Sequence, residues 1–207
     1  MLRELGVRSL GPVAALNVTH ATHLHPSFSP KKEMGQYYKA IILNATGKYV
    51  VTWVPSALVK LMEHSYIGED CVKRMEALIC PDGVFGKSRV VWCGDYADDK
   101  SIYEACTDLK MSRPRFRDMP TYPYLVNHCK KLYVKTAREF EGFQGIHPLP
   151  ILTAEGNGRG GGDYLGKQME LVGTWARDVI SVEKDIPEGC EELVCEFMEG
   201  RGPYYNY

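Results

Sequence analysis

The chain has 207 residues, of which 44% are hydrophobic and 25% charged, the balance of an ordinary globular protein. Its 25 Lys and Arg residues stand against 26 Asp and Glu, so the formal net charge is −1. That charge argues against nucleic-acid binding through bulk positive charge. No apolar run approaches the roughly 20 residues that span a bilayer, so we expect no membrane association. Seven cysteines without a CxxC pair predict reduced thiols and a cytoplasmic location.

Residues 1–33 are expected to be a disordered leader or an extension from an upstream start codon. Three histidines, His20, His23 and His25, interrupt a weakly apolar stretch, and the Pro- and Lys-containing segment after them is typical of a linker. The sequence then predicts a single α+β domain over 34–200 and a short tail over 201–207.

Hydrophobic periodicity predicts the elements of this domain in chain order. Strands are expected at 37–43, 49–54, 89–93, 124–127, 132–136 and 191–198, helices at 57–64, 70–79 and 101–109, and a strand or short helix at 175–182. Ser56 is the expected N-cap of the first helix. The fold prediction is a mixed or antiparallel sheet built from hairpins, with two or three short helices packed on it.

The two predicted hairpins resemble each other. Each has an apolar residue and an Asn before the turn, at Asn44 and Asn127, followed by a Lys and a Tyr-Val pair. One interpretation is that hairpins with Asn at the turn converge on this pattern. The alternative is that the two hairpins are equivalent parts of one sheet.

The segment from Glu155 to Asp163 is the first candidate site, because five of its nine residues are glycine. Its order fits neither a P-loop nor a dinucleotide fingerprint. A glycine-rich backbone can offer several N–H groups to an anion, and an Arg can grip a phosphate or carboxylate. Arg177 and Asp178 either form ion pairs with Asp163 and Arg159 across a cleft or are ordinary surface charges. The candidate ligand-binding residues are Asn157, Gly158, Arg159, Gly160, Gly161, Gly162, Asp163 and Arg177.

A second candidate lies where the 89–93 strand ends. Asp95 and Asp98 follow it directly, and carboxylates at a strand end can hold a divalent metal, which is the one cofactor that the sequence suggests. His64, at the end of the first helix, and His147, before a Pro, are candidate acid–base groups. His64 is equally compatible with a helix-capping role.

Several blocks resemble a family of small proteins from bacteria, their phages and mobile elements that typically begin Met-Gly-Gln-Tyr-Tyr-Lys. They include Met34–Lys39, Leu61–Ser65, Val91–Asp98, Tyr124–His128 and the run from His147 through Asp163 to Ala176. The resemblance implies a start at Met34 and implies no activity. Arg159 and Arg177 stand where relatives are expected to have an apolar residue, which shifts weight to Asn157, Asp163, Asp95 and His64.

The leading function hypothesis is the binding of a small polar ligand, nucleotide-like or phosphate-bearing, between the glycine-rich segment and Asp95–Asp98. One alternative is a metal-dependent hydrolase that uses Asp95, Asp98 and His64. Another is a protein-interaction module that inhibits a host protein, with which the 13 Tyr residues are compatible.

Overall fold

The computed structural model describes residues 35–56, 59–106, 122–136, 145–156 and 162–197. The chain divides into residues 1–31 and residues 32–207, and all of the described residues lie in the second unit. The strands there are β1 (Tyr38–Leu43), β2 (Val50–Val54), β3 (Ser88–Gly94), β4 (Tyr124–Asn127), β5 (Leu132–Lys135), β6 (Ala154–Glu155), β7 (Val179–Glu183) and β8 (Glu191–Glu192). The helices are α1 (Leu61–Ser65), α2 (Asp70–Ile79), α3 (Lys100–Ala105), α4 (Pro148–Leu152) and a 3-10 turn, η1 (Met169–Leu171).

One open sheet organises the described residues, with the strand order β2-β1-β3-β7-β4-β5-β8. β1–β2 and β4–β5 are antiparallel hairpins, β1 and β4 each pair with a longer central strand, and β3 and β7 pair with each other. Read inward from β2 or from β5, the sheet therefore shows the same succession: the outer strand of a hairpin, the inner strand of that hairpin, and a central strand. β6 pairs parallel with β3, and β8 pairs parallel with β5. The predicted α+β class with a hairpin-built mixed sheet is confirmed.

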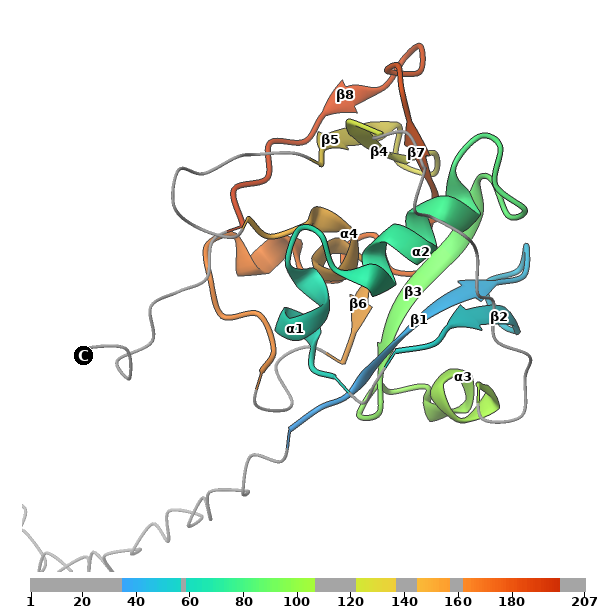
Figure 1. Ribbon diagram of the computed structural model, residues 1–207, viewed down its shortest axis with the longest axis vertical. Helices are drawn as coiled ribbons and strands as arrows, with labels where there is room; N and C mark the ends of the chain where they lie inside the picture. The colour runs from blue at the N-terminus through green and yellow to red at the C-terminus, as the bar shows by residue number, and fades with distance from the viewer. Residues whose placement is uncertain (1–34, 57–58, 107–121, 137–144, 157–161, 198–207) are drawn as a thin grey trace, which may run out of the picture. The chain divides into compact units, whose positions relative to one another are not determined.

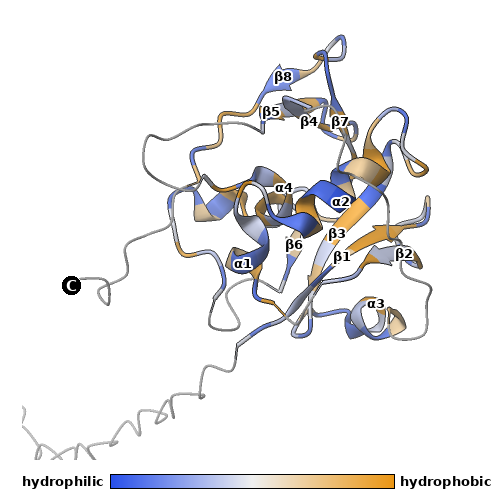
Figure 2. Cartoon of the chain, in the orientation of Figure 1, coloured by the Kyte–Doolittle hydropathy of each residue, from blue (hydrophilic) through white to orange (hydrophobic). Residues whose placement is uncertain are grey.

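The sheet buries a different set of side chains on each face. Alternation along β1 and β3 places Ala40 and Trp92 on one face and Ile41 and Val91 on the other. The first face packs against α1, α2 and α4, and the second carries a smaller cluster that includes Ile102 of α3 (Figure 1). Figure 2 shows apolar residues on the central strands, whereas β8 at the sheet's end is hydrophilic.

Three predicted elements differ from the structure for local reasons. The first helix starts at Leu61, because the Glu63 carboxylate accepts from the Lys60 N–H at 2.8 Å and so caps the helix at Lys60. The prediction of Ser56 as the N-cap of this helix is therefore wrong. The strand after Trp175 begins only at Val179, because Arg177 has a left-handed backbone with φ of 64°. The last strand pairs only over Glu191–Glu192.

Three further features concern α4, membrane-crossing helices and the cysteines. α4 begins with Pro148, whose missing N–H is not needed in the first helical turn. No helix among the described residues is long and apolar enough to cross a membrane. All seven cysteines lie in this part of the chain, and all are free thiols.

Candidate functional site

The candidate site lies where β1 begins and where β3 and β6 end; we call it the strand-end site. β3 and β6 are parallel, so the chain leaves both strands at the same edge of the sheet. Asp95 follows β3 there, and Gly156 follows β6. On the other side of β1, the main-chain carbonyl of Gly162 accepts from the Met62 N–H at 3.1 Å. The two described ends of the glycine-rich segment therefore flank the same strand end as Asp95.

A buried hydrogen-bond cluster lies at the strand-end site. The Tyr38 hydroxyl lies 3.0 Å from Gln36 Oε1 and 3.0 Å from Asp163 Oδ1. Tyr38, Gln36 and Asp163 are 1%, 0% and 5% exposed, so solvent does not compete for these bonds. Burial, with the Asp163 charge second, raises the pKa of Tyr38 well above its ordinary value. The phenol is therefore a permanent donor at neutral pH.

The Gln36 amide is incompletely satisfied. Its Nε2 is buried and has no hydrogen-bond partner in the described part of the chain. A hydroxyl has one proton, so Tyr38 can donate to Asp163 or to Gln36, but not to both. Turning the amide over would let Gln36 donate to the Tyr38 oxygen, and would then leave its carbonyl oxygen in the unpartnered position. In either orientation one polar atom of Gln36 is unpaired.

Three glycines make room for neighbouring side chains at this edge. A β-carbon on Gly94 or Gly156 would lie 2.2 Å or 2.3 Å from Gln36 Nε2, and one on Gly162 would lie 2.2 Å from Lys60 Cδ. Gly156 and Gly162 also have positive φ angles of 96° and 85°. Packing therefore accounts for the glycines at both described ends of the segment.

Of the other residues predicted to bind a ligand, Asp163 joins the buried cluster and Arg177 does not. Arg177 donates from Nε and Nη2 to the two oxygens of Glu155 at 2.5 and 2.8 Å, and it lies 3.4 Å from Asp99. A pairing of Arg177 with Asp163 is therefore wrong, because Glu155 and Asp99 already hold the guanidinium. Asp178 pairs with Lys130 instead. Asn157, Gly158, Arg159, Gly160 and Gly161 lie outside the described residues.

The predicted acid–base and metal residues do not come together as a metal site. Asp95 closes the strand end, since its Oδ1 accepts from the Tyr37 N–H at 3.1 Å, and Asp98 is exposed. His64 Nδ1 accepts from Trp92 Nε1 at 2.9 Å, inside the core. Over the described ranges, no three His, Cys, Asp or Glu side chains are grouped so that they could hold a metal ion.

The histidine candidates have structural partners. His147 caps α4, because its Nδ1 accepts from the Leu149 N–H at 3.2 Å while Nε2 lies 3.1 Å from Glu76. His64 is 2% exposed, and burial lowers its pKa to about 4. Because Nδ1 is an acceptor, the neutral ring carries its proton on Nε2, which has no partner among the described residues.

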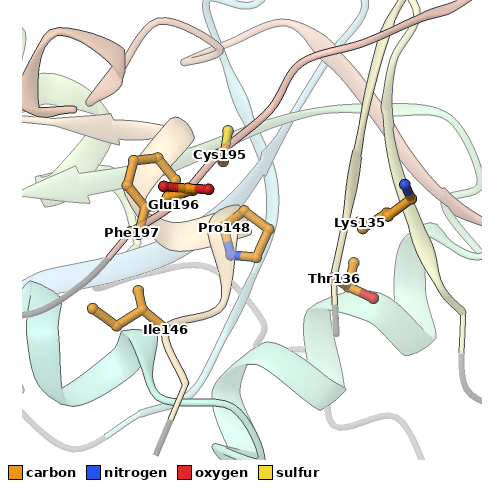
Figure 3. Close-up of a pocket in the computed structure, with 7 residues that line it drawn as sticks. All are labelled: Lys135, Thr136, Ile146, Pro148, Cys195, Glu196 and Phe197. Atoms are coloured by element: carbon orange, nitrogen blue, oxygen red, sulfur yellow. The ribbon is translucent and has the colours of Figure 1, made fainter. Parts of the chain in front are cut away.

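Sequence reasoning missed three features. Lys60 lays its side-chain stem across Gly162, and only the structure brings these distant residues together. Ser181 Oγ lies 2.7 Å from His128 Nε2 and 2.6 Å from Glu183 Oε1, and its side chain is fully buried. A small open pocket (Figure 3) contains none of the predicted residues; it is lined by Lys135, Thr136, Ile146, Pro148, Cys195, Glu196 and Phe197.

Comparison with known proteins adds nothing to this geometry: neither a protein-family model, nor a curated protein, nor a solved structure matches the chain.

Proposed function

We propose that the chain binds a small polar ligand at the strand-end site. The observation that carries the proposal is the buried Gln36–Tyr38–Asp163 cluster, which has an unpaired amide atom and lies between the two described ends of the glycine-rich segment. Buried polar groups are almost always satisfied, so an unpaired one next to a candidate loop favours a missing partner. A ligand with both donors and acceptors on one edge would complement this cluster.

The charges favour a nucleotide-like ligand. Lys60 is half-buried beside Gly162, and it has no carboxylate partner in the part of the chain that the structure describes. Its ammonium group suits a phosphate, whereas the amide, phenol and carboxylate of the buried cluster suit the edge of a base. Arg177 is not needed for this mode of binding, because Glu155 and Asp99 already neutralise it.

We also propose that the chain belongs to the family of bacterial and phage proteins that its sequence blocks resemble. In that setting the ligand would suit a signalling nucleotide of the host. Finding the coding sequence away from any phage or mobile-element gene would count against this part of the proposal.

The test is a thermal-shift screen of the whole chain with nucleotides, cyclic dinucleotides, inorganic phosphate and divalent metals. A ligand at 100 times its Kd should add about 2.7 kcal/mol of apparent stability. Tyr38→Phe and Lys60→Gln should each weaken the affinity for the ligand at least tenfold. Asp185→Asn, at an exposed position after β7, should leave the affinity unchanged. A shift that both site variants retain would exclude the strand-end site, and the absence of a shift with every compound would refute ligand binding.

The same screen distinguishes the ligand-binding proposal from the alternative of a metal-dependent hydrolase. That alternative requires a shift with a divalent metal, its loss in Asp95→Asn, and turnover of a phosphate ester by the metal-loaded protein. Binding without turnover would favour the ligand-binding proposal.

A further inference from the structure

The single proton of the Tyr38 hydroxyl orders the hydrogen bonds at the strand-end site. The hydroxyl has two neighbours at the same distance, Gln36 Oε1 and Asp163 Oδ1, each 3.0 Å away. A hydrogen bond to an ionised carboxylate is roughly twice as strong as one to a neutral amide. Tyr38 therefore donates to Asp163, and its oxygen is left facing Gln36 as an acceptor.

This order of donors fixes the orientation of the Gln36 amide. With the amide oxygen toward Tyr38, two acceptors would face each other without a proton between them. With the amide turned over, its nitrogen donates to the Tyr38 oxygen, and the hydrogen bonds run in one direction from Gln36 through Tyr38 to Asp163. The amide oxygen then occupies the buried position that has no partner.

The unpaired position lies next to two glycines. A β-carbon on Gly94 or Gly156 would be 2.2 Å or 2.3 Å from it. The Ala97 nitrogen is 3.1 Å from the same point on Gly156, but its N–H already donates to the Gly94 carbonyl at 3.0 Å. This N–H is therefore engaged, and the Gln36 oxygen is left as an acceptor that a ligand can use.

The hydrogen-bonding character of this place determines what complements it. Both the Gln36 oxygen and the Asp163 carboxylate are acceptors there, and the carboxylate has lone pairs beyond the one that Tyr38 uses. A ligand must therefore bring N–H donors, because a ligand carbonyl would meet like partial charges. Sites built around buried polar groups discriminate strongly against analogues that lack the matching donor.

We infer that the strand-end site selects a nucleobase with an exocyclic amine, as in adenine, guanine or cytosine, over one without it, as in hypoxanthine or uracil. The amine has two protons, and it donates to the Gln36 oxygen and to Asp163. The inference rests on the proposed function, since it describes the base edge of the same ligand, whose phosphate is bound by Lys60.

Calorimetric titration of the full chain with AMP, GMP, CMP, IMP and UMP tests the preference. The tightest-binding amino nucleotide is expected to exceed its counterpart, IMP for a purine and UMP for CMP, at least tenfold in affinity. Gln36→Met keeps the length of the side chain and removes both polar atoms, so it should abolish the preference. Lys60→Gln acts on the phosphate, so it should weaken both members of a pair alike and leave their ratio unchanged.

The orientation of the Gln36 amide can be measured in the wild-type protein without a ligand. In the ¹⁵N-labelled chain, nuclear Overhauser effects from the Gln36 side-chain amide protons should be strongest to the Tyr38 ring. Stronger effects to the α-protons of Gly94 and Gly156 would overturn the inference, because they would place the amide nitrogen in the unpaired position.

The binding results separate this inference from the proposed function. Equal affinity within each pair, or tighter binding of IMP or UMP, would overturn the inference and leave ligand binding at the site intact. Binding of none of the five nucleotides would refute a nucleotide ligand, and this inference with it.

Discussion

The buried His64 should make the stability of the protein strongly dependent on pH below neutrality. Burial holds its pKa at about 4 in the folded state, against an ordinary value of 6.5. Protonation would also turn Nδ1 into a donor facing the Trp92 N–H, so the hydrogen bond between them would be lost. Between pH 6.5 and 4 the unfolded state binds more protons than the folded state. The contribution of His64 is therefore complete above pH 6.5 and is lost as the pH falls toward 4.

The magnitude follows from the shift in pKa. A lowering from 6.5 to about 4 corresponds to about 3 kcal/mol of unfolding free energy, at 1.36 kcal/mol per unit. Urea denaturation at a series of pH values measures it. His64→Asn is the matched control, since its side-chain oxygen can still accept from Trp92 but does not titrate. Other titrating groups are common to both proteins and cancel in the difference.

The wild type should lose about 3 kcal/mol more than His64→Asn between pH 7 and pH 4. Parallel curves for the two proteins would refute the reasoning, because they would show that His64 does not titrate with a lowered pKa. An ordinary pKa for the His64 resonance in an NMR titration would lead to the same conclusion.

Three further predictions concern packing and ion pairs. Gly94→Ala should lower the unfolding free energy by about 1–3 kcal/mol, because its β-carbon would meet the Gln36 amide, and adding Gln36→Ala should recover most of that loss in a double-mutant cycle. Arg177→Ala should lower the unfolding free energy by about 1–3 kcal/mol, because it removes a bidentate, half-buried ion pair. Lys135→Ala removes a more exposed pair and should lower the unfolding free energy by at most about 1 kcal/mol. Equal losses for the two variants in urea denaturation would contradict this ranking. Gly173→Ala should lower the thermal midpoint clearly, because its β-carbon would lie 2.4 Å from a backbone oxygen at a φ of 72°, and an unchanged midpoint would contradict the geometry.

Much of the fold could be predicted because it depends on local patterns. The β1–β2 and β4–β5 hairpins, and α2 over Asp70–Ile79, lie where apolar periodicity and turn residues indicate them. Asn44 and Asn127 both accept main-chain N–H bonds in their turns, so the shared Asn has the same physical role in each. Both hairpins also belong to one sheet, as the second interpretation of their likeness expects.

What the sequence could not predict depends on contacts between distant residues. The alternation of Leu193, Cys195 and Phe197 suggests a full strand, and Cys195 and Phe197 are indeed buried. The strand nevertheless ends at Glu192; the Leu193 N–H still donates to the Tyr133 carbonyl of β5, and the Glu196 N–H donates to the side chain of Gln168. Periodicity reports which side chains are buried and carries no information about which backbone supplies the partner.

At the candidate site, too, the sequence shows the local pattern and misses the contacts between distant residues. These contacts change the reason for proposing a ligand there. Glycine density in the sequence suggested a loop that approaches a ligand, yet Gly156 and Gly162 are explained by the side chains of Gln36 and Lys60. The case for a ligand now depends on the unpaired amide of Gln36, a residue whose environment is set by contacts far along the chain. A glycine-rich segment can thus mark a binding site indirectly, because the glycines accommodate the polar side chains that a ligand would use.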